Sequence, residues 1–232
     1  YINPVQFWAL EMHNNTTGGG NGFLYVGCKY NFSSSITSWV ELMIDDYQAN
    51  REIKKDLELN EIGFMLGVEK RGWPLQLSSL WLEYTGITNR TYQTDHSMET
   101  YTHRGFPIGH YLGNDFDMLQ LYYSQENING KLQPYISLAY LRDGINGLDT
   151  PFDTPWIDDL SITMETGYSE SFPTSPITYI IETEIGFGYN LSPQSFINIS
   201  YFYQYKSKLN IDTKNSIINV RLLYYLGKTF TY

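Results

Sequence analysis

This chain of 232 residues has little cysteine, little clustered positive charge and no long apolar run. Cys28 is its only cysteine, which excludes an intrachain disulfide. Asp and Glu number 25 against 15 Lys and Arg, so the formal net charge is -10. Because nucleic acid is held by clustered basic side chains, and no such cluster occurs here, we do not expect nucleic acid as a partner.

No stretch approaches the roughly 20 consecutive apolar residues that a membrane-spanning helix needs. No apolar stripe with the 3.6-residue period is long enough to predict a helix. Aromatic residues, in contrast, make up 16% of the chain, and 21 of them are tyrosines. Because such amphipathic rings form belts at both interfaces of membrane proteins, the composition favours a membrane protein built from strands.

Strict alternation of apolar and polar residues is plainest at 197–205. Ile197, Ile199 and Tyr201 alternate there with Asn198 and Ser200. Successive side chains of a strand point to opposite faces, so this segment separates an apolar medium from a polar one. In a soluble sandwich the apolar face would be core, whereas in an outer-membrane barrel it would face lipid.

The same alternation predicts eleven strands along the chain, with a possible extra strand near 96–103. The predicted segments are 8–12, 24–30, 40–44, 62–68, 80–84, 119–123, 136–140, 160–164, 177–189, 197–205 and 218–226. We therefore predict an all-β fold, an antiparallel transmembrane outer-membrane β-barrel that forms a single domain over 1–232. About 10–12 strands are visible, and because the chain begins at Tyr1 without a signal-like segment we expect its N-terminal part to be incomplete.

Two further patterns favour a location in the bacterial outer membrane. Apolar residues of one parity, interrupted only by Lys228, run to the last residue, as in the assembly signal of outer-membrane proteins: Leu222, Tyr224, Leu226, Phe230 and Tyr232. The predicted inner side of the strands is mostly acidic, with Glu11, Glu41, Asp45, Glu61, Glu83, Glu165, Glu182 and Glu184 against Lys29 and Arg221. Since charge on a lipid-facing surface is costly, this one-sided placement fits a barrel whose partner is outer-membrane lipid.

Chemistry is expected in the two long connections, 87–115 and 143–159, because long loops are where function concentrates. They combine aromatic rings, which stack on sugar faces, with polar groups that bond sugar hydroxyls. The candidate stacking residues are Tyr101, Phe106, Tyr111 and Trp156, and the candidate hydrogen-bonding residues are Arg104, His110, Asp115 and Asp117. For the segment 104–115 the alternative is an ordered surface or lumen-folded loop whose glycines permit tight turns.

Catalysis, metal and cofactors are not expected. His96, His103 and His110 are spaced by seven residues, which matches no metal motif such as H-E-x-x-H. There is no G-x-S-x-G nucleophile motif. His110 with Asp115 or Asp117 is the one candidate acid–base group, and a loop anchored by hydrogen bonds explains these residues equally well.

Several motifs resemble the capsule assembly protein Wzi family over roughly residues 36–210. They are the segment 39–48 (WVELMIDDYQ), the loop from Gly105 to Gly113, Pro151-Phe152 with Pro155-Trp156, and the turn from Glu170 to Pro173. The resemblance implies an outer-membrane barrel with more strands than the eleven counted here and a small helical part. It also implies a lectin-like, non-catalytic role in binding capsular polysaccharide and holding it on the cell surface.

The sequence thus predicts a protein that binds a surface polysaccharide through many weak loop contacts. One alternative is a passive channel or structural barrel whose acidic lumen favours cations. Another is a barrel subunit of an envelope complex with protein partners. Steady conductance, glycan binding and pull-down from native membranes distinguish the three.

Overall fold

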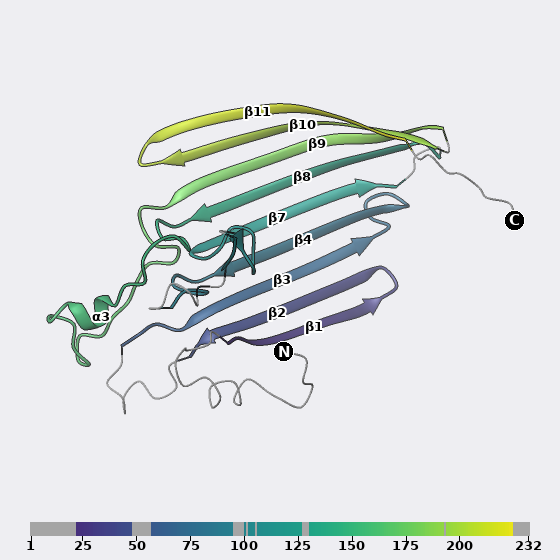
Figure 1. The fold of residues 1–232 in the computed structure, drawn as a ribbon. Coiled ribbons are helices and arrows are strands. Elements are labelled where there is room, and N and C mark those ends of the chain that lie inside the picture. The colour runs from purple at the N-terminus through teal and green to yellow at the C-terminus, as the bar shows by residue number, and fades with distance from the viewer. Residues whose placement is uncertain are drawn as a thin grey trace, which may run out of the picture.

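Nine antiparallel strands form one continuous sheet in the computed structural model, which describes residues 22–47, 57–94, 100, 102–104, 106–126, 130–192 and 194–224 (Figure 1). The strands are β1 (Leu24–Ser33), β2 (Ile36–Asp46), β3 (Glu61–Arg71), β4 (Ser78–Ile87), β7 (Phe116–Gln125), β8 (Leu132–Asp143), β9 (Thr178–Ser192), β10 (Ser195–Lys208) and β11 (Ile211–Tyr224). Neighbours in the sheet follow the chain order throughout. The all-β, antiparallel part of the sequence prediction is confirmed.

Two small elements lie in the connections between these strands. β5 (Thr102–His103) and β6 (Phe106–Pro107) form a two-stranded ribbon, and α3 (Pro155–Asp158) is a single helical turn. Proline at the start of α3 sets a helical backbone angle where no amide donor is needed. A helix this short leaves no apolar stripe to detect. No helix among the described residues is long and apolar enough to cross a membrane.

The predicted strand at 160–164 is wrong, because this segment consists of turns. The Asp159 carboxylate accepts hydrogen bonds from the backbone N–H (2.9 Å) and the hydroxyl (2.7 Å) of Ser161. The Thr166 hydroxyl accepts one from the backbone N–H of Thr163 at 2.7 Å. Such local bonds compete with strand pairing, and Leu160, the first residue of the expected apolar face, is 93% exposed.

Some predictions fall outside the described residues. They are the first strand at 8–12 with Glu11, most of the possible strand near 96–103, the candidate Tyr101 and the end of the chain from 225 to Tyr232. Every other predicted strand coincides with one of the nine observed ones.

The two faces of the sheet differ in chemistry. Paired residues of neighbouring strands share a face, and one such row runs Val40, Leu66, Tyr84, Leu119, Tyr140, Ile181 and Tyr205. We call the face that carries this row the outer face. A neighbouring row on the other side, the inner face, runs Lys29, Trp39, Gly67, Glu83, Gln120, Ala139, Glu182, Gln204 and Asn215.

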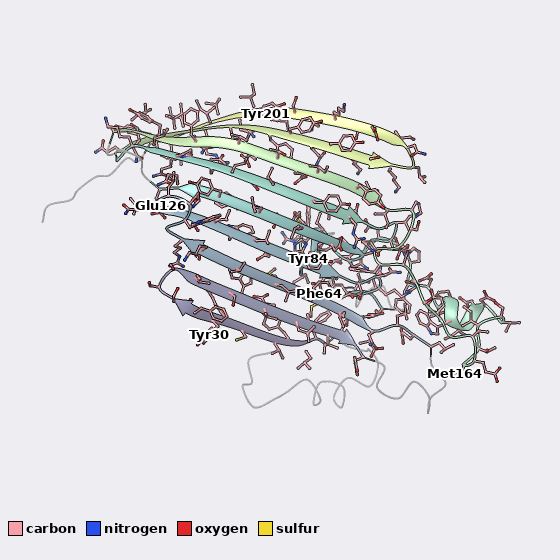
Figure 2. The ribbon with its side chains drawn as sticks, turned by 180° about the vertical axis from the view of Figure 1, so that it is seen from behind. Tyr30, Phe64, Tyr84, Glu126, Met164 and Tyr201 are labelled. Atoms are coloured by element: carbon pink, nitrogen blue, oxygen red, sulfur yellow. The ribbon has the colours of Figure 1, made fainter. Side chains whose placement is uncertain are left out.

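The outer face is apolar and bare. Tyr30, Phe64, Tyr84 and Tyr201, labelled in Figure 2, belong to it and come from four strands. Exposed fractions on this face include 50% for Val40, 54% for Ile185 and 72% for Ile218. In a soluble sandwich this is the face that a second layer would cover, yet no second layer of helix or sheet covers it within the described part of the chain.

Charged side chains on the outer face are confined to the ends of strands. Register places five of them there: Lys70, Asp117, Arg142, Asp212 and Lys214. Each lies within four residues of the nearest strand terminus. The middle of the outer face therefore carries no charge among the described residues, as a lipid-facing band requires.

The two ends of the sheet also differ (Figure 1). At one end, which we call the short-turn end, residues 34–35, 72–77, 126–131 and 193–194 join successive strands. At the other, the long-connection end, the strands are joined by 47–60, 88–115 and 144–177, with 209–210 as the one short link. Short turns on one side and long loops on the other are typical of outer-membrane barrels.

The described sheet is open. β1 and β11 form its edges, and neither has a second strand partner among the described residues. Because the nine strands alternate in direction, β1 and β11 point the same way. A closed barrel is not seen, so the finer part of the fold prediction remains a proposal.

Candidate functional site

The described residues among those predicted to carry function lie at the long-connection end. There Tyr92 of the connection 88–115 packs against strand ends on the inner face, in the one apolar core cluster of the described residues. Its members are Ile87, Tyr92, Phe116, Met118, Leu141 and Ile180. All but Tyr92 belong to the ends of strands β4, β7, β8 and β9, so burial of these strand ends anchors the loop.

Arg90 joins the two longest connections. Its side chain is 4% exposed and lies 2.7 Å from the Asp153 carboxylate and 2.6 Å from the Glu170 carboxylate. Its guanidinium also sits 5.0 Å from the centre of the Trp156 ring, a cation–π contact. A buried arginine with two carboxylates and an aromatic ring is fully engaged, so it holds 144–177 against 88–94.

Glu170 is the most heavily bonded partner in this cluster. Besides Arg90 it accepts hydrogen bonds from the Asn89 amide at 3.1 Å and from the Tyr168 hydroxyl. Burial alone would raise the pKa of Glu170, but the bonds from Arg90, Tyr168 and Asn89 outweigh it and lower the pKa. Glu170 is therefore held as a carboxylate in a structural network.

Asp115 ties together three separate loop segments. Its carboxylate is fully buried and accepts hydrogen bonds from the backbone N–H groups of Thr174 (2.8 Å) and Asn146 (3.1 Å) and from the Thr174 hydroxyl (3.1 Å). Burial raises its pKa, while these donors pull the pKa down. Gly144 leaves the room for this arrangement, because a Cβ there would lie 2.0 Å from an Asp115 oxygen.

Asp117 lies on the outer face, not in the loop. Its carboxylate accepts a hydrogen bond from Arg142 Nε at 2.8 Å and one from the Tyr84 hydroxyl at 2.6 Å. It is 4% exposed, so all of its bonding capacity is directed to neighbouring strands. This ion pair sits at the boundary between the apolar outer face and the long connections, where charge is tolerated.

His110 stacks in an aromatic group. Its ring centre lies 4.6 Å from that of Phe116 and 4.5 Å from that of Tyr111, and its Nδ1 accepts a hydrogen bond from the Leu112 N–H at 3.3 Å. Burial lowers the pKa of His110 to about 4. The imidazole is thus uncharged at neutral pH and presents a flat apolar ring.

Seven of the eight predicted sugar-binding residues are described, and they divide into an accessible and a buried group. Arg104, Phe106 and Tyr111 are exposed, the last two at 73% and 67%, and His110 is half-buried. Asp115, Asp117 and Trp156 are buried and engaged by other protein groups, while Tyr101 is not described. The structure brings together only His110 and Tyr111, so the accessible part of the predicted site is an aromatic loop surface.

Sequence reasoning missed Arg90 and its partners as the organising group of this end. Arg90 lies 63 positions from Asp153 and 80 from Glu170, and no spacing rule connects residues so far apart. The turn beginning at Glu170 did carry part of the family resemblance.

A small pocket of about 80 Å³ lies beside Arg90. Its lining includes Glu61, Asn60, Asn89 and Ser171.

No group of three or more His, Cys, Asp or Glu side chains suited to a metal ion occurs in the part of the chain that the structure describes.

No family model, curated protein or solved structure matches the chain. The resemblance to the Wzi family therefore stands on the quoted motifs and remains a prediction.

Proposed function

We propose that this chain contributes an outer-membrane β-barrel that binds a surface polysaccharide and helps to attach it to the bacterial cell, without catalysis, as in the capsule assembly protein Wzi family. The observation that carries the membrane part is the outer face, which is apolar, bare and charged only near strand ends. In a soluble sandwich a second sheet covers the apolar face, whereas no second layer covers this one among the described residues.

The inner face supports the same proposal, because its polar groups satisfy one another across strands. The Trp39 indole N–H donates to Glu83 at 2.8 Å, and the Gln204 amide donates to Glu182 at 2.7 Å. The Tyr135 hydroxyl bonds Glu184 at 3.1 Å. Polar groups removed from water need such partners, whereas a lipid-facing surface cannot hold them.

Closure of the barrel sets a condition on strand number. Since β1 and β11 point the same way, an all-antiparallel barrel requires an odd number of further strands between these two edges. The proposal that the chain forms part of a larger barrel meets this condition when one, three or another odd number of strands is added.

The membrane proposal is tested by a matched pair on β8. Leu138→Arg adds charge to the outer face, and Ser137→Arg adds it to the inner face one residue away. Arginine near the bilayer midplane costs about 2–4 kcal/mol on a lipid-facing position, so L138R should fold into lipid vesicles much less completely than S137R. Gel mobility of the folded form measures this, and equal or reversed effects would contradict a lipid-facing outer face.

The polysaccharide proposal rests on the exposed rings of Phe106 and Tyr111 at the long-connection end. The double variant Phe106→Ser, Tyr111→Ser should reduce retention of surface polysaccharide on cells, while the folded barrel stays at normal levels in the outer membrane. Tyr47→Ser, another exposed aromatic at the same end of the sheet, is the control. Unchanged retention in the double variant would remove the support for glycan binding.

A cation-favouring pore is the second candidate, because the inner-face row carries Glu83 and Glu182, and Glu184 lies in the next row. Steady cation-selective conductance in a planar bilayer would favour the pore. Glycan binding without conductance across the bilayer would favour the lectin-like role.

A further inference from the structure

A second candidate binding site lies on the inner face and borders the aromatic loop surface, because His110, which lines it, also packs against Tyr111. It is a pocket of about 190 Å³ between strands β1–β4 and the connection 88–115. The side chains that matter for its chemistry are Tyr25, Glu41, Met43, Met65, Tyr92 and His110. A pocket of this size holds one small ligand or one residue of a longer one.

Charge in this pocket is entirely negative. Glu41 is the one carboxylate among its described lining residues, and no Lys or Arg belongs to the lining. His110 does not oppose it, since burial lowers the pKa of that imidazole to about 4. The rest of the lining consists of aromatic rings, whose faces attract a cation, together with aliphatic groups, two thioethers and Thr85.

The register of β1 and β2 sets one wall. Gly27 is paired with Glu41, and a Cβ at Gly27 would lie 2.9 Å from the Tyr25 hydroxyl oxygen. The Tyr25 ring therefore lies over Gly27, with its hydroxyl beside the Glu41 carboxylate. A side chain at position 27 would displace this ring, so the glycine permits the pairing of ring and carboxylate.

Tyr92 provides the facing wall from the loop. Its backbone N–H donates to the Asp45 carboxylate at 2.6 Å, and its ring packs edge-on against Phe23 with ring centres 5.7 Å apart. The ring also lies over Gly109, where a Cβ would come within 2.4 Å of it. Two glycines thus let two tyrosines approach the same pocket from different segments.

We propose that this pocket binds an organic ammonium group, with the Glu41 carboxylate as counter-ion and the Tyr25 and Tyr92 rings as aromatic walls. A single carboxylate with electron-rich rings and no competing cation is the combination that recognises protonated or quaternary amines. The ligand is either an amino sugar or a free small amine, which share this chemistry.

Binding of three probes to the purified chain in detergent micelles tests the proposal by calorimetry. Glucosamine carries the ammonium group, N-acetylglucosamine is its neutral counterpart, and choline is a cation without a sugar. Glucosamine or choline should bind at least about tenfold more tightly than N-acetylglucosamine. Preference for glucosamine identifies an amino sugar, preference for choline a free amine, and equal binding of both sugars or no binding at all overturns the proposal.

Variants locate the site. Glu41→Gln should weaken ammonium binding by about tenfold or more, while Glu126→Gln, at the short-turn end (Figure 2), should leave it unchanged. Tyr25→Phe keeps the ring and should retain most of the ammonium binding, whereas Tyr25→Ala should weaken that binding several-fold. Tyr25 is 58% exposed on an edge strand, so this pair remains informative where E41Q fails to fold. Wild-type binding in folded E41Q and Y25A would refute the site.

The two proposals fail separately. The glycan proposal is measured by retention of polysaccharide through Phe106 and Tyr111, and this one by a small ligand at Glu41. Either read-out can fail while the other succeeds, because the variants at Glu41 and Tyr25 do not replace Phe106 or Tyr111.

Discussion

The two ends of the sheet are built by different means. At the short-turn end, links of a few residues join paired strands, and their side-chain bonds stay within one turn or reach an adjacent strand. The Ser33 hydroxyl, for example, accepts from the N–H groups of Ser35 and Ile36. At the long-connection end, buried charges join segments far apart in the chain, as Arg90 does with Glu170. The difference shows that the end able to carry a binding surface is held by tertiary contacts that the strands alone do not supply.

Two arginines make the sharpest test of this difference. Arg90 is buried and paired with Asp153 and Glu170, while Arg71 pairs with Glu69 at the short-turn end with 58% of its side chain exposed. Arg90→Ala leaves Glu170 buried without its cation and should cost about 3–5 kcal/mol of unfolding free energy. Arg71→Ala should cause no measurable change, because exposed pairs contribute little.

Chemical denaturation and limited proteolysis of 144–177 measure the effect of the two arginine variants. Faster cleavage in R90A and wild-type cleavage in R71A are expected. Similar behaviour of both variants would show that the Arg90 cluster does not hold this connection.

A smaller effect is expected when a single acceptor is removed at each end. Asp115→Ala leaves the N–H groups of Thr174 and Asn146 without their acceptor in a buried site and should cost about 1–3 kcal/mol. Ser33→Ala removes an acceptor for two N–H groups at an exposed turn, where water replaces it. Denaturation midpoints compare the two, and an equal loss in both would contradict the role of Asp115 as a buried link.

The effect that is smallest at neutral pH is a pH dependence confined to the long-connection end. An unfolded histidine has a pKa of about 6.5, and burial lowers the pKa of His110 to about 4 in the folded chain. Between these two pKa values the folded chain binds fewer protons than the unfolded chain. The contribution of His110 to the free energy of unfolding is therefore complete above about pH 6.5 and declines as the pH falls towards about 4. His110→Gln should flatten that part of the stability profile, and His103→Gln, in the exposed ribbon, should not. An unchanged slope in H110Q would refute the assignment.

Much of the sheet could be predicted because strands impose a period of two. The alternation of Ile197, Ile199 and Tyr201 with polar neighbours predicted β10 and its faces, and the pairing confirms them. The segment 160–164 showed the same alternation and is not a strand, because the Asp159 and Thr166 side chains hold the backbone in turns. A period detects the faces of a strand but not the local bonds that compete with pairing.

The candidate site was predicted less well. Asp115, Asp117 and Arg104 looked alike in the sequence as polar residues of one loop, yet the first is a buried link, the second joins an outer-face ion pair and the third is exposed. Arg90 gave no signal because its partners lie 63 and 80 positions away. Contacts of that span depend on how connections pack, which no local pattern encodes.

The sequence by itself determined most of the strands, their apolar and polar faces and the negative net charge, because side-chain alternation and charge are properties of the local chain. Only the tertiary structure decided which loop residues are buried links, which remain exposed, and that Tyr25, Glu41 and Tyr92 share one pocket. Those outcomes depend on strand register and on the packing of long connections, where residues distant in sequence compete for the same buried space.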